Sequence, residues 1–213
     1  RTDLIASAMY YDRNDDQEII ESLPPFDTVN SIEEHGDGYN LEAQYLYRGT
    51  HTDLIAGGAY FDQDLNTTQF FDVTQAGSPI FSEFSKEDTD FKQTTLYTYG
   101  GVRYPKNVNW TVGISSDLID KKDDGDDFDE TKLNPKFGAL WSPRDATTVR
   151  VAAFKMQRRL TLVDQTIEPT QVAGFNQFFD DPPGSDVERY AAALDQKVSS
   201  SVFAGIEISK RDL

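Results

Sequence analysis

Apolar and polar side chains alternate strictly along residues 39–48. Tyr39, Leu41, Ala43, Tyr45 and Tyr47 fall on one side of an extended chain, and Asn40, Glu42, Gln44, Leu46 and Arg48 fall on the other. After turn residues 49–53, the alternation continues through Leu54, Ala56, Gly58 and Tyr60. The pattern predicts an antiparallel hairpin with arms of about ten residues, close to the 9 to 11 that a tilted transmembrane strand needs.

Similar segments recur along the chain and predict nine strands. They are Asp3 to Arg13, Tyr39 to Arg48, Asp53 to Phe61, Thr94 to Tyr104, Val108 to Leu118, Leu133 to Trp141, Thr148 to Met156, Arg189 to Lys197 and Ser200 to Ser209. The connections are tight at 49–52, 105–107, 142–147 and 198–199, and long at 14–37, 62–92, 120–132 and 157–189. Tight and long connections at opposite ends are typical of up-and-down barrels, whereas sandwiches mix them. We therefore expect an all-β fold: a transmembrane antiparallel up-and-down β-barrel, partial because nine strands is odd and bacterial barrels have even counts.

The two faces of the predicted strands differ in polarity. The apolar face, which we expect to meet lipid, includes Leu41, Ala43, Tyr45, Val112, Ile114, Ala204 and Ile206. The polar face, which we expect to line a lumen and substrate path, includes Glu42, Gln44, Arg48, Arg103, Asp117, Lys136, Arg150 and Glu207. Aromatic residues beside the tight turns form either an interfacial belt or ordinary core contacts, and we favour the belt: Tyr47, Tyr104, Trp110 and Trp141.

Composition agrees with this fold class. The 213 residues contain no cysteine, which excludes a disulfide framework and a thiolate metal site. There is no apolar run long enough for a membrane-spanning helix, and the mean hydropathy is −0.57. The four long connections hold 28 of the 37 acidic and 8 of the 20 basic residues, a net charge of −20 against +3 elsewhere. This acidity argues against a nucleic-acid partner. It predicts a cation-selective outer vestibule, or carboxylates that meet anionic lipopolysaccharide (LPS) through divalent cations.

No motif predicts catalysis, a metal or a cofactor. The acidic run Asp120 to Glu130 fails the EF-hand spacing, and we interpret it as a solvated loop. His35 and His51 lie in different connections, so they do not form a metal pair or serve a nucleophile motif. Aromatic residues of the last long connection either contact a ligand at the extracellular loops or pack that loop on the barrel: Phe175, Phe178 and Phe179.

The last 80 or so residues resemble a known family. The segments LNPKFGALWSPRDATTVRVAAFKMQRR, DQTIEPTQVAGFNQFFDD and RYAAALDQKVSSSVFAGIEISKRDL are similar to the C-terminal barrel of TonB-dependent-receptor-like outer-membrane proteins, in the branch fused to tetratricopeptide repeats. The closest pieces are Asn134-Pro135-Lys136, Trp141-Ser142-Pro143 and Glu168-Pro169-Thr170-Gln171. The resemblance implies a transport-type barrel in the outer membrane of a Gram-negative bacterium, although the 213 residues show no plug domain and no TonB box.

We therefore expect residues 1–213 to be one outer-membrane β-barrel domain, a segment of a longer chain. The expected function is that of a transporter or porin-like channel passing a solute or polymer, not an enzyme. Expected partners are outer-membrane lipid or LPS and a periplasmic repeat domain or TonB-type protein. Two alternatives stay open at this point: an outer-membrane enzyme with its chemistry at the rim, and a soluble β-sandwich binding module.

Overall fold

The computed structural model describes residues 1–123, 127–158, 166–178 and 184–213, and within them the fold is all-β. Nine strands form one antiparallel sheet in the order β1-β2-β3-β4-β5-β6-β7-β10-β11, and β8-β9 form a separate pair. The bounds are β1 Thr2–Leu23, β2 Phe26–Arg48, β3 Thr52–Gln75, β4 Ser78–Arg103, β5 Val108–Asp123, β6 Asp127–Arg144, β7 Thr147–Gln157, β8 Gln171–Val172, β9 Phe175–Asn176, β10 Asp186–Lys197 and β11 Phe203–Asp212. No helix in these ranges is long and apolar enough to cross a membrane.

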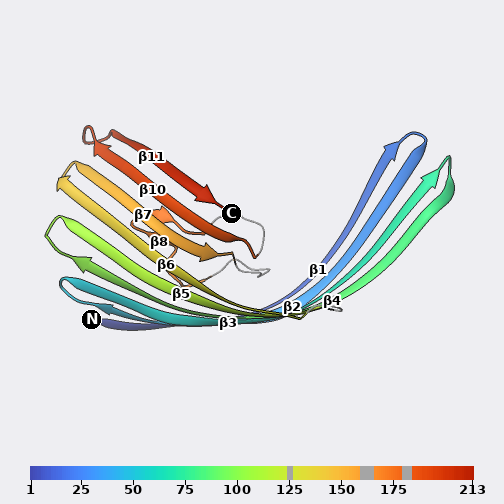
Figure 1. Ribbon diagram of the computed structural model, residues 1–213, viewed down its shortest axis with the longest axis horizontal. Coiled ribbons are helices and arrows are strands. Elements are labelled where there is room, and N and C mark those ends of the chain that lie inside the picture. Colours follow the sequence, from blue (N-terminus) through green and yellow to red (C-terminus); the bar gives the residue numbers. More distant parts are fainter. Residues whose placement is uncertain (124–126, 159–165, 179–183) are drawn as a thin grey trace.

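The main sheet is a single curved layer, and the β8-β9 pair lies inside its curve (Figure 1). Within the described residues, β1 and β11 are the two edges of this sheet and do not pair with each other. The sheet is therefore an open trough. This confirms the expected nine-stranded, up-and-down, partial barrel and rules out the two face-to-face sheets of a sandwich.

Three of the four predicted long loops were wrong, because most of their residues continue the strands. β1 and β2 stay paired until Leu23 faces Phe26, and β3 and β4 until Gln75 faces Ser78. The latter pair turns through Ala76 (φ 50°) and Gly77 (φ 80°), the two positive φ angles of a tight hairpin turn. The acidic run divides between β5 and β6, with Asp120 facing Asp129, and its residues 124–126 lie outside the described ranges. In the fourth predicted loop, the described residues between β7 and β10 contain only the two-residue strands β8 and β9.

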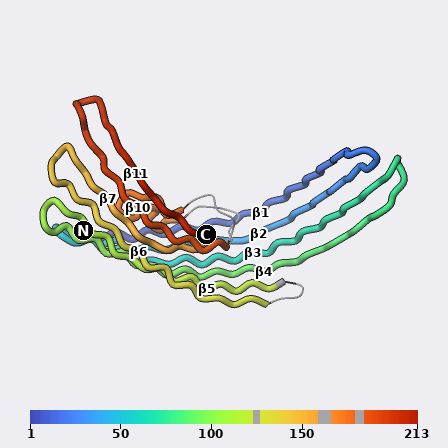
Figure 2. The backbone as a smooth tube through the Cα atoms, turned by 45° about the horizontal axis from the view of Figure 1, so that its top comes forward, coloured from blue at the N-terminus to red at the C-terminus, as the bar shows by residue number. Residues whose placement is uncertain are grey.

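The first four strands therefore run well past the others. We call residues 12–37 and 63–90 the extension; it curves away from the rest of the sheet in both views (Figures 1 and 2). Its 12 or 13 residues per strand span about 40 Å at about 3.3 Å per residue.

Residues that face each other across two strands share a face of the sheet, so the register divides the side chains into two sets. Exposed side chains on the convex face include Leu41, Ala43, Tyr45, Val112 and Ile114. Buried side chains on the concave face include Glu42, Gln44, Asp117 and Lys136, each 3–4% exposed. Ala204 and Ile206 are also exposed, but so is almost all of the edge strand β11, so their exposure does not distinguish its faces.

The convex face carries an apolar band bounded by aromatic side chains. At the end with the turns 49–51 and 104–107, exposed aromatics are Tyr47, Tyr104, Trp110 and Trp141. Toward the extension, Tyr10 and Tyr39 face each other and are both exposed. On β2 the band runs from Tyr39 to Tyr47, nine residues, which is within the range of a tilted transmembrane strand.

Candidate functional site

A segment of the long connection lies against the concave face. We call residues 166–178 the inner segment; it contains β8 and β9, joined by Ala173 (φ 50°) and Gly174 (φ 80°). This turn approaches β6 closely, because a Cβ placed on Gly138 would lie 2.7 Å from the Cβ of Ala173. A side chain at position 138 would therefore push the inner segment off the sheet.

One end of the inner segment is bonded to β2. The carboxylate of Glu42 accepts hydrogen bonds from the backbone N–H of Ile167 (2.7 Å) and the hydroxyl of Thr166 (3.1 Å). The side-chain amide of Gln44 donates to the carbonyl oxygen of Ile167 (2.6 Å). These two β2 side chains thus satisfy both backbone groups of Ile167, as a neighbouring strand would do.

Two tyrosines of β4 extend this polar network, and Tyr99 bonds the inner segment directly. The hydroxyl of Tyr99 donates to Glu168 Oε1 (2.6 Å) and accepts from Gln177 Nε2 (3.1 Å). Tyr97 accepts from Gln44 Nε2 (3.1 Å). All five of these polar side chains are buried at 4% exposure or less. Burial of this many polar groups is tolerated because they bond one another.

Two arginines anchor the other end around a phenylalanine. The guanidinium of Arg150 lies 4.7 Å from the ring centroid of Phe175, and that of Arg189 lies 5.8 Å from it. Arg150 also donates to the carbonyl oxygen of Gly174 (2.9 Å), and Arg189 to that of Asn176 (2.9 Å). Both guanidinium groups are paired with carboxylates: Arg150 with Asp195 (2.6 Å) and Arg189 with Glu207 (2.7 Å).

Phe175 itself is 1% exposed, in an apolar cluster with Val172 and side chains of β7 and β10. Of the two alternatives for Phe175, the structure supports packing of the loop on the barrel and not an exposed contact, since the ring fixes the inner segment to the sheet. Phe178 is half-buried, and Phe179 lies outside the described residues.

A second polar cluster surrounds Asp117 of β5. This residue lies nearer the extension than Ser115, the β5 residue that faces Tyr97. The carboxylate of Asp117 accepts from Gln93 (3.0 Å), Thr95 (2.6 Å) and Asn134 (2.7 Å). All four side chains are buried. Hydrogen bonds from the three donors replace the water that would otherwise solvate this carboxylate. Lys136 is also buried; its ammonium donates to the carbonyl oxygen of Lys155 (3.2 Å).

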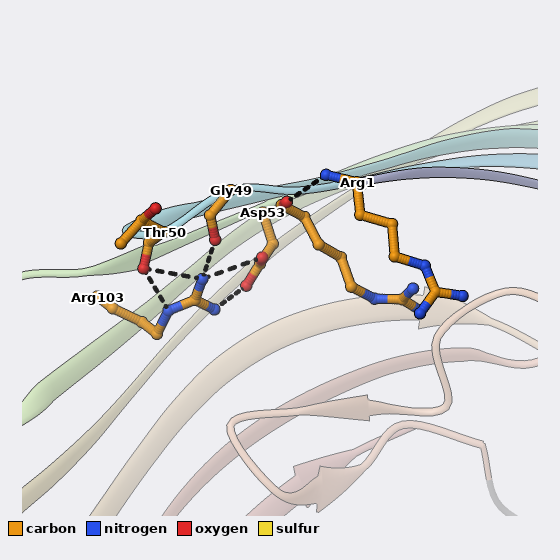
Figure 3. Close-up of polar contacts among 6 residues, drawn as sticks. Arg1, Gly49, Thr50, Asp53 and Arg103 are labelled. Atoms are coloured by element: carbon orange, nitrogen blue, oxygen red, sulfur yellow. Dashed lines mark hydrogen bonds and ion pairs between the residues drawn. The ribbon is translucent and has the colours of Figure 1, made fainter.

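Two of the sequence-predicted lumen residues lie at the tight-turn end, away from the inner segment. Figure 3 shows Arg103 of β4 bonded to the carbonyl oxygens of Gly49 (2.6 Å) and Thr50 (3.3 Å) and to the carboxylate of Asp53. Arg48 pairs with Asp3. Both arginines therefore fasten strand ends and turns.

Three of the predicted lumen residues thus bond the inner segment directly: Glu42, Gln44 and Arg150. Glu207 contributes indirectly, because it pairs with Arg189, which bonds the inner segment. Sequence reasoning did not single out Tyr97, Tyr99, Glu168, Gln177 or Arg189 as site residues. Tyr97 and Tyr99 lie on the polar face of their strand, and this position in the alternation is the sequence feature that could have identified them. Within the described residues, no group of three or more His, Cys, Asp or Glu side chains could hold a metal ion.

No family model and no curated protein matches this sequence. Among solved structures, the chain is similar to the ferripyoverdine receptor of the outer membrane of Pseudomonas aeruginosa, with 10% identity over 99% of this chain and 30% of that one, and a TM-score of 0.68. It is similar to the ferric citrate transporter FecA, with 10% identity, coverage of 99% and 32%, and a TM-score of 0.63. The ferric yersiniabactin uptake receptor FyuA from Yersinia pestis gives 11% identity, coverage of 99% and 33%, and a TM-score of 0.60.

The chain spans about a third of the length of these structures. At such low identity the similarity establishes the fold alone. It supports the receptor-like barrel implied by the C-terminal sequence segments, while the tetratricopeptide fusion stays a prediction. The nine-stranded trough therefore has the fold of part of an outer-membrane receptor barrel.

Proposed function

We propose that this chain forms part of a β-barrel in the outer membrane of a Gram-negative bacterium, and that the barrel passes a solute or polymer rather than catalysing a reaction. The observation that carries the proposal is the difference between the two faces of one sheet. The convex face has an exposed apolar band of transmembrane length between aromatic side chains, and the concave face has buried polar clusters. Such a sheet fits lipid on one side and an aqueous path on the other.

The fold similarity supports the same function, because the three similar structures are a ferripyoverdine receptor, a ferric yersiniabactin uptake receptor and a ferric citrate transporter. Outer-membrane lipid is the proposed partner of the apolar band. A periplasmic repeat domain or a TonB-type protein is a further proposed partner, suggested by the sequence resemblance.

The proposed path follows the polar face, lined by Glu42, Gln44, Arg48, Arg103, Asp117, Lys136, Arg150 and Glu207. The inner segment lies across this path from β2 to β10 and narrows it. A loop held inside a barrel by this many contacts sets the width of the passage.

Conductance across planar bilayers tests the proposal, measured on the whole barrel that contains this chain, because the nine-stranded sheet alone is open. We expect a conductance that prefers K⁺ over Cl⁻ in a KCl gradient, because the acidic extension lies at one mouth. The variant Phe175→Ser, which removes the anchor of the inner segment, should conduct more than the wild type. Absence of conductance from both proteins, or anion preference in the wild type, would contradict a transport path lined by these residues.

A further inference from the structure

The extension carries a strong negative charge. Residues 12–37 and 63–90 contain 15 acidic and 2 basic residues, a net charge of −13 out of −17 for the whole chain. One of the two basic residues, Arg13, is already paired with Asp15 (2.6 Å), and the other, Lys86, with Asp88 (3.1 Å). The field of the extension therefore attracts a cationic partner and repels an anionic one.

Apolar side chains on the concave face of the extension lie among these carboxylates. Ile19 and Phe81 are 47% and 50% exposed, and Ile32 and Phe71 are half-buried beside them. The rings of Phe71 and Phe81 pack edge to face with centroids 6.3 Å apart, so both lie on the same face. Exposed apolar side chains grouped in this way mark contact surfaces rather than a core.

Four carboxylates surround this apolar group on the same face. By register, Glu21 lies in the row of Phe81, Glu83 in the row of Ile19 and Phe71, and Glu34 and Glu87 share a row nearer the membrane band. None of the four pairs with a basic side chain in the described part of the chain. We call these four carboxylates with Ile19, Ile32, Phe71 and Phe81 the docking patch.

The edge of the sheet beside the docking patch is open. β5 pairs with β4 only as far as Thr89, so residues 78–88 of β4 have no strand on their outer side within the described ranges. Their backbone N–H and C=O groups can accept an added strand. An unpaired backbone edge suits a polypeptide, whereas it offers nothing to a lipid.

We propose that the docking patch and the adjoining β4 edge bind a cationic, amphipathic polypeptide in an extended conformation. One stretch of such a polypeptide pairs with the β4 edge, and the next stretch crosses the concave face. There its basic groups meet Glu21, Glu34, Glu83 and Glu87, and its apolar groups meet Ile19, Phe71 and Phe81. This inference takes one point from the proposed function, namely that the extension lies in water outside the membrane. A failure of conductance therefore leaves it standing.

Fluorescence anisotropy of labelled peptides tests the proposal, with the full chain in zwitterionic detergent micelles and empty micelles as the baseline. Each peptide repeats two residues of one kind followed by two of the other, so that both kinds of side chain lie on each face of an extended strand. A Lys/Leu peptide should bind, a Lys/Ser peptide more weakly, and a Glu/Leu peptide not at all. Binding of the Lys/Leu peptide to the wild type should weaken as salt rises, because charges in water are screened beyond about 8 Å at 0.15 M salt.

Variants locate the binding face. Replacing Glu21, Glu34, Glu83 and Glu87 by Gln should weaken binding of the Lys/Leu peptide by about tenfold or more, since each exposed ion pair contributes about 0.2–1 kcal/mol. The matched control removes four charges from the convex face of the same extension: Asp16→Asn, Glu18→Gln, Glu33→Gln and Asp72→Asn. It should weaken binding much less. The apolar pair Ile19→Ser with Phe81→Ser should also weaken binding, and its convex counterpart, Ile20→Ser with Phe84→Ser, should not.

Three results would overturn the proposal: equal binding of the Glu/Leu peptide, equal losses from the concave and convex charge variants, or no dependence on salt. Binding of lipopolysaccharide micelles in Ca²⁺ without binding of the Lys/Leu peptide would also reject it, in favour of a lipid contact.

Discussion

The position of Tyr99 depends on the absence of a side chain at Gly113, which faces it across β4 and β5. A Cβ at position 113 would lie 2.6 Å from Cδ1 of Tyr99. Gly113→Ala should displace the ring, weaken its bonds to Glu168 and Gln177, and cost about 1–3 kcal/mol. Hydrogen exchange of residues 166–178 should then become faster.

Gly100→Ala is the matched control, because its Cβ would meet only the carbonyl oxygen of Val112, at 3.8 Å. It should leave the exchange of the inner segment unchanged. Equal protection of the inner segment in both variants would show that Tyr99 does not hold it.

Asp64 in the extension gives a pH dependence. Burial raises the pKa of this carboxyl above its ordinary value, and the hydrogen bond and charge of Asp90 opposite raise it further. A raised pKa in the folded state means that the folded chain holds this proton more tightly than the unfolded chain does. The β3–β4 extension therefore loses stability as pH rises from the ordinary pKa of an aspartate to the raised pKa of folded Asp64.

Asp64→Asn should therefore slow hydrogen exchange of residues 63–90 at neutral pH, by the few tenths of a kcal/mol typical of opposed like charges on a solvated sheet. The difference should vanish in acid, where Asp64 is protonated in both states. A stabilisation that persists at low pH would mean that charge repulsion is not the cause.

Among the elements, the inner segment is the one whose attachment is most easily tested. Phe175→Ser removes a ring buried in an apolar cluster, a loss of about 3–5 kcal/mol for a full truncation, and should release residues 166–178 from the sheet. A cysteine at Gln177, which is fully buried, reports the release by its rate of thiol labelling. The same cysteine with Phe203→Ala, a change at an exposed ring, should label as slowly as the parent. Slow labelling in the Phe175→Ser chain would contradict the anchoring role.

The strands could be predicted from the sequence only where one face is apolar. Between Tyr39 and Arg48 the alternation is strict because one side meets the band and the other the trough. In the extension both faces meet water, so apolar neighbours such as Ile19 and Ile20, or Phe70 and Phe71, occupy opposite faces and the period of two disappears. The sequence therefore predicts loops for most of the extension, where the structure has strands.

The site was predictable in part for the same reason. Glu42, Gln44 and Asp117 stand out as polar positions in alternating strands. Their partners do not, because the inner segment has strands of only two residues and its bond to Glu42 joins residues 125 positions apart. Local periodicity carries no information about such a contact.

For the whole molecule, the proposed function requires that the two faces of one sheet lie in different solvents. The chain has no cysteine, so single cysteines can carry a spin label without background. Suitable positions are Leu41 and Ile114 on the convex face, and Thr111 on the concave face.

The decisive measurement is the collision rate of each label with lipid-soluble oxygen and with a water-soluble nickel chelate, for the protein in bilayers. We predict that labels at positions 41 and 114 meet oxygen and exclude the chelate, and that a label at position 111 shows the opposite preference. Labels at positions 41 and 114 that meet the chelate, or that are shielded from both reagents as under a second sheet, would contradict the account.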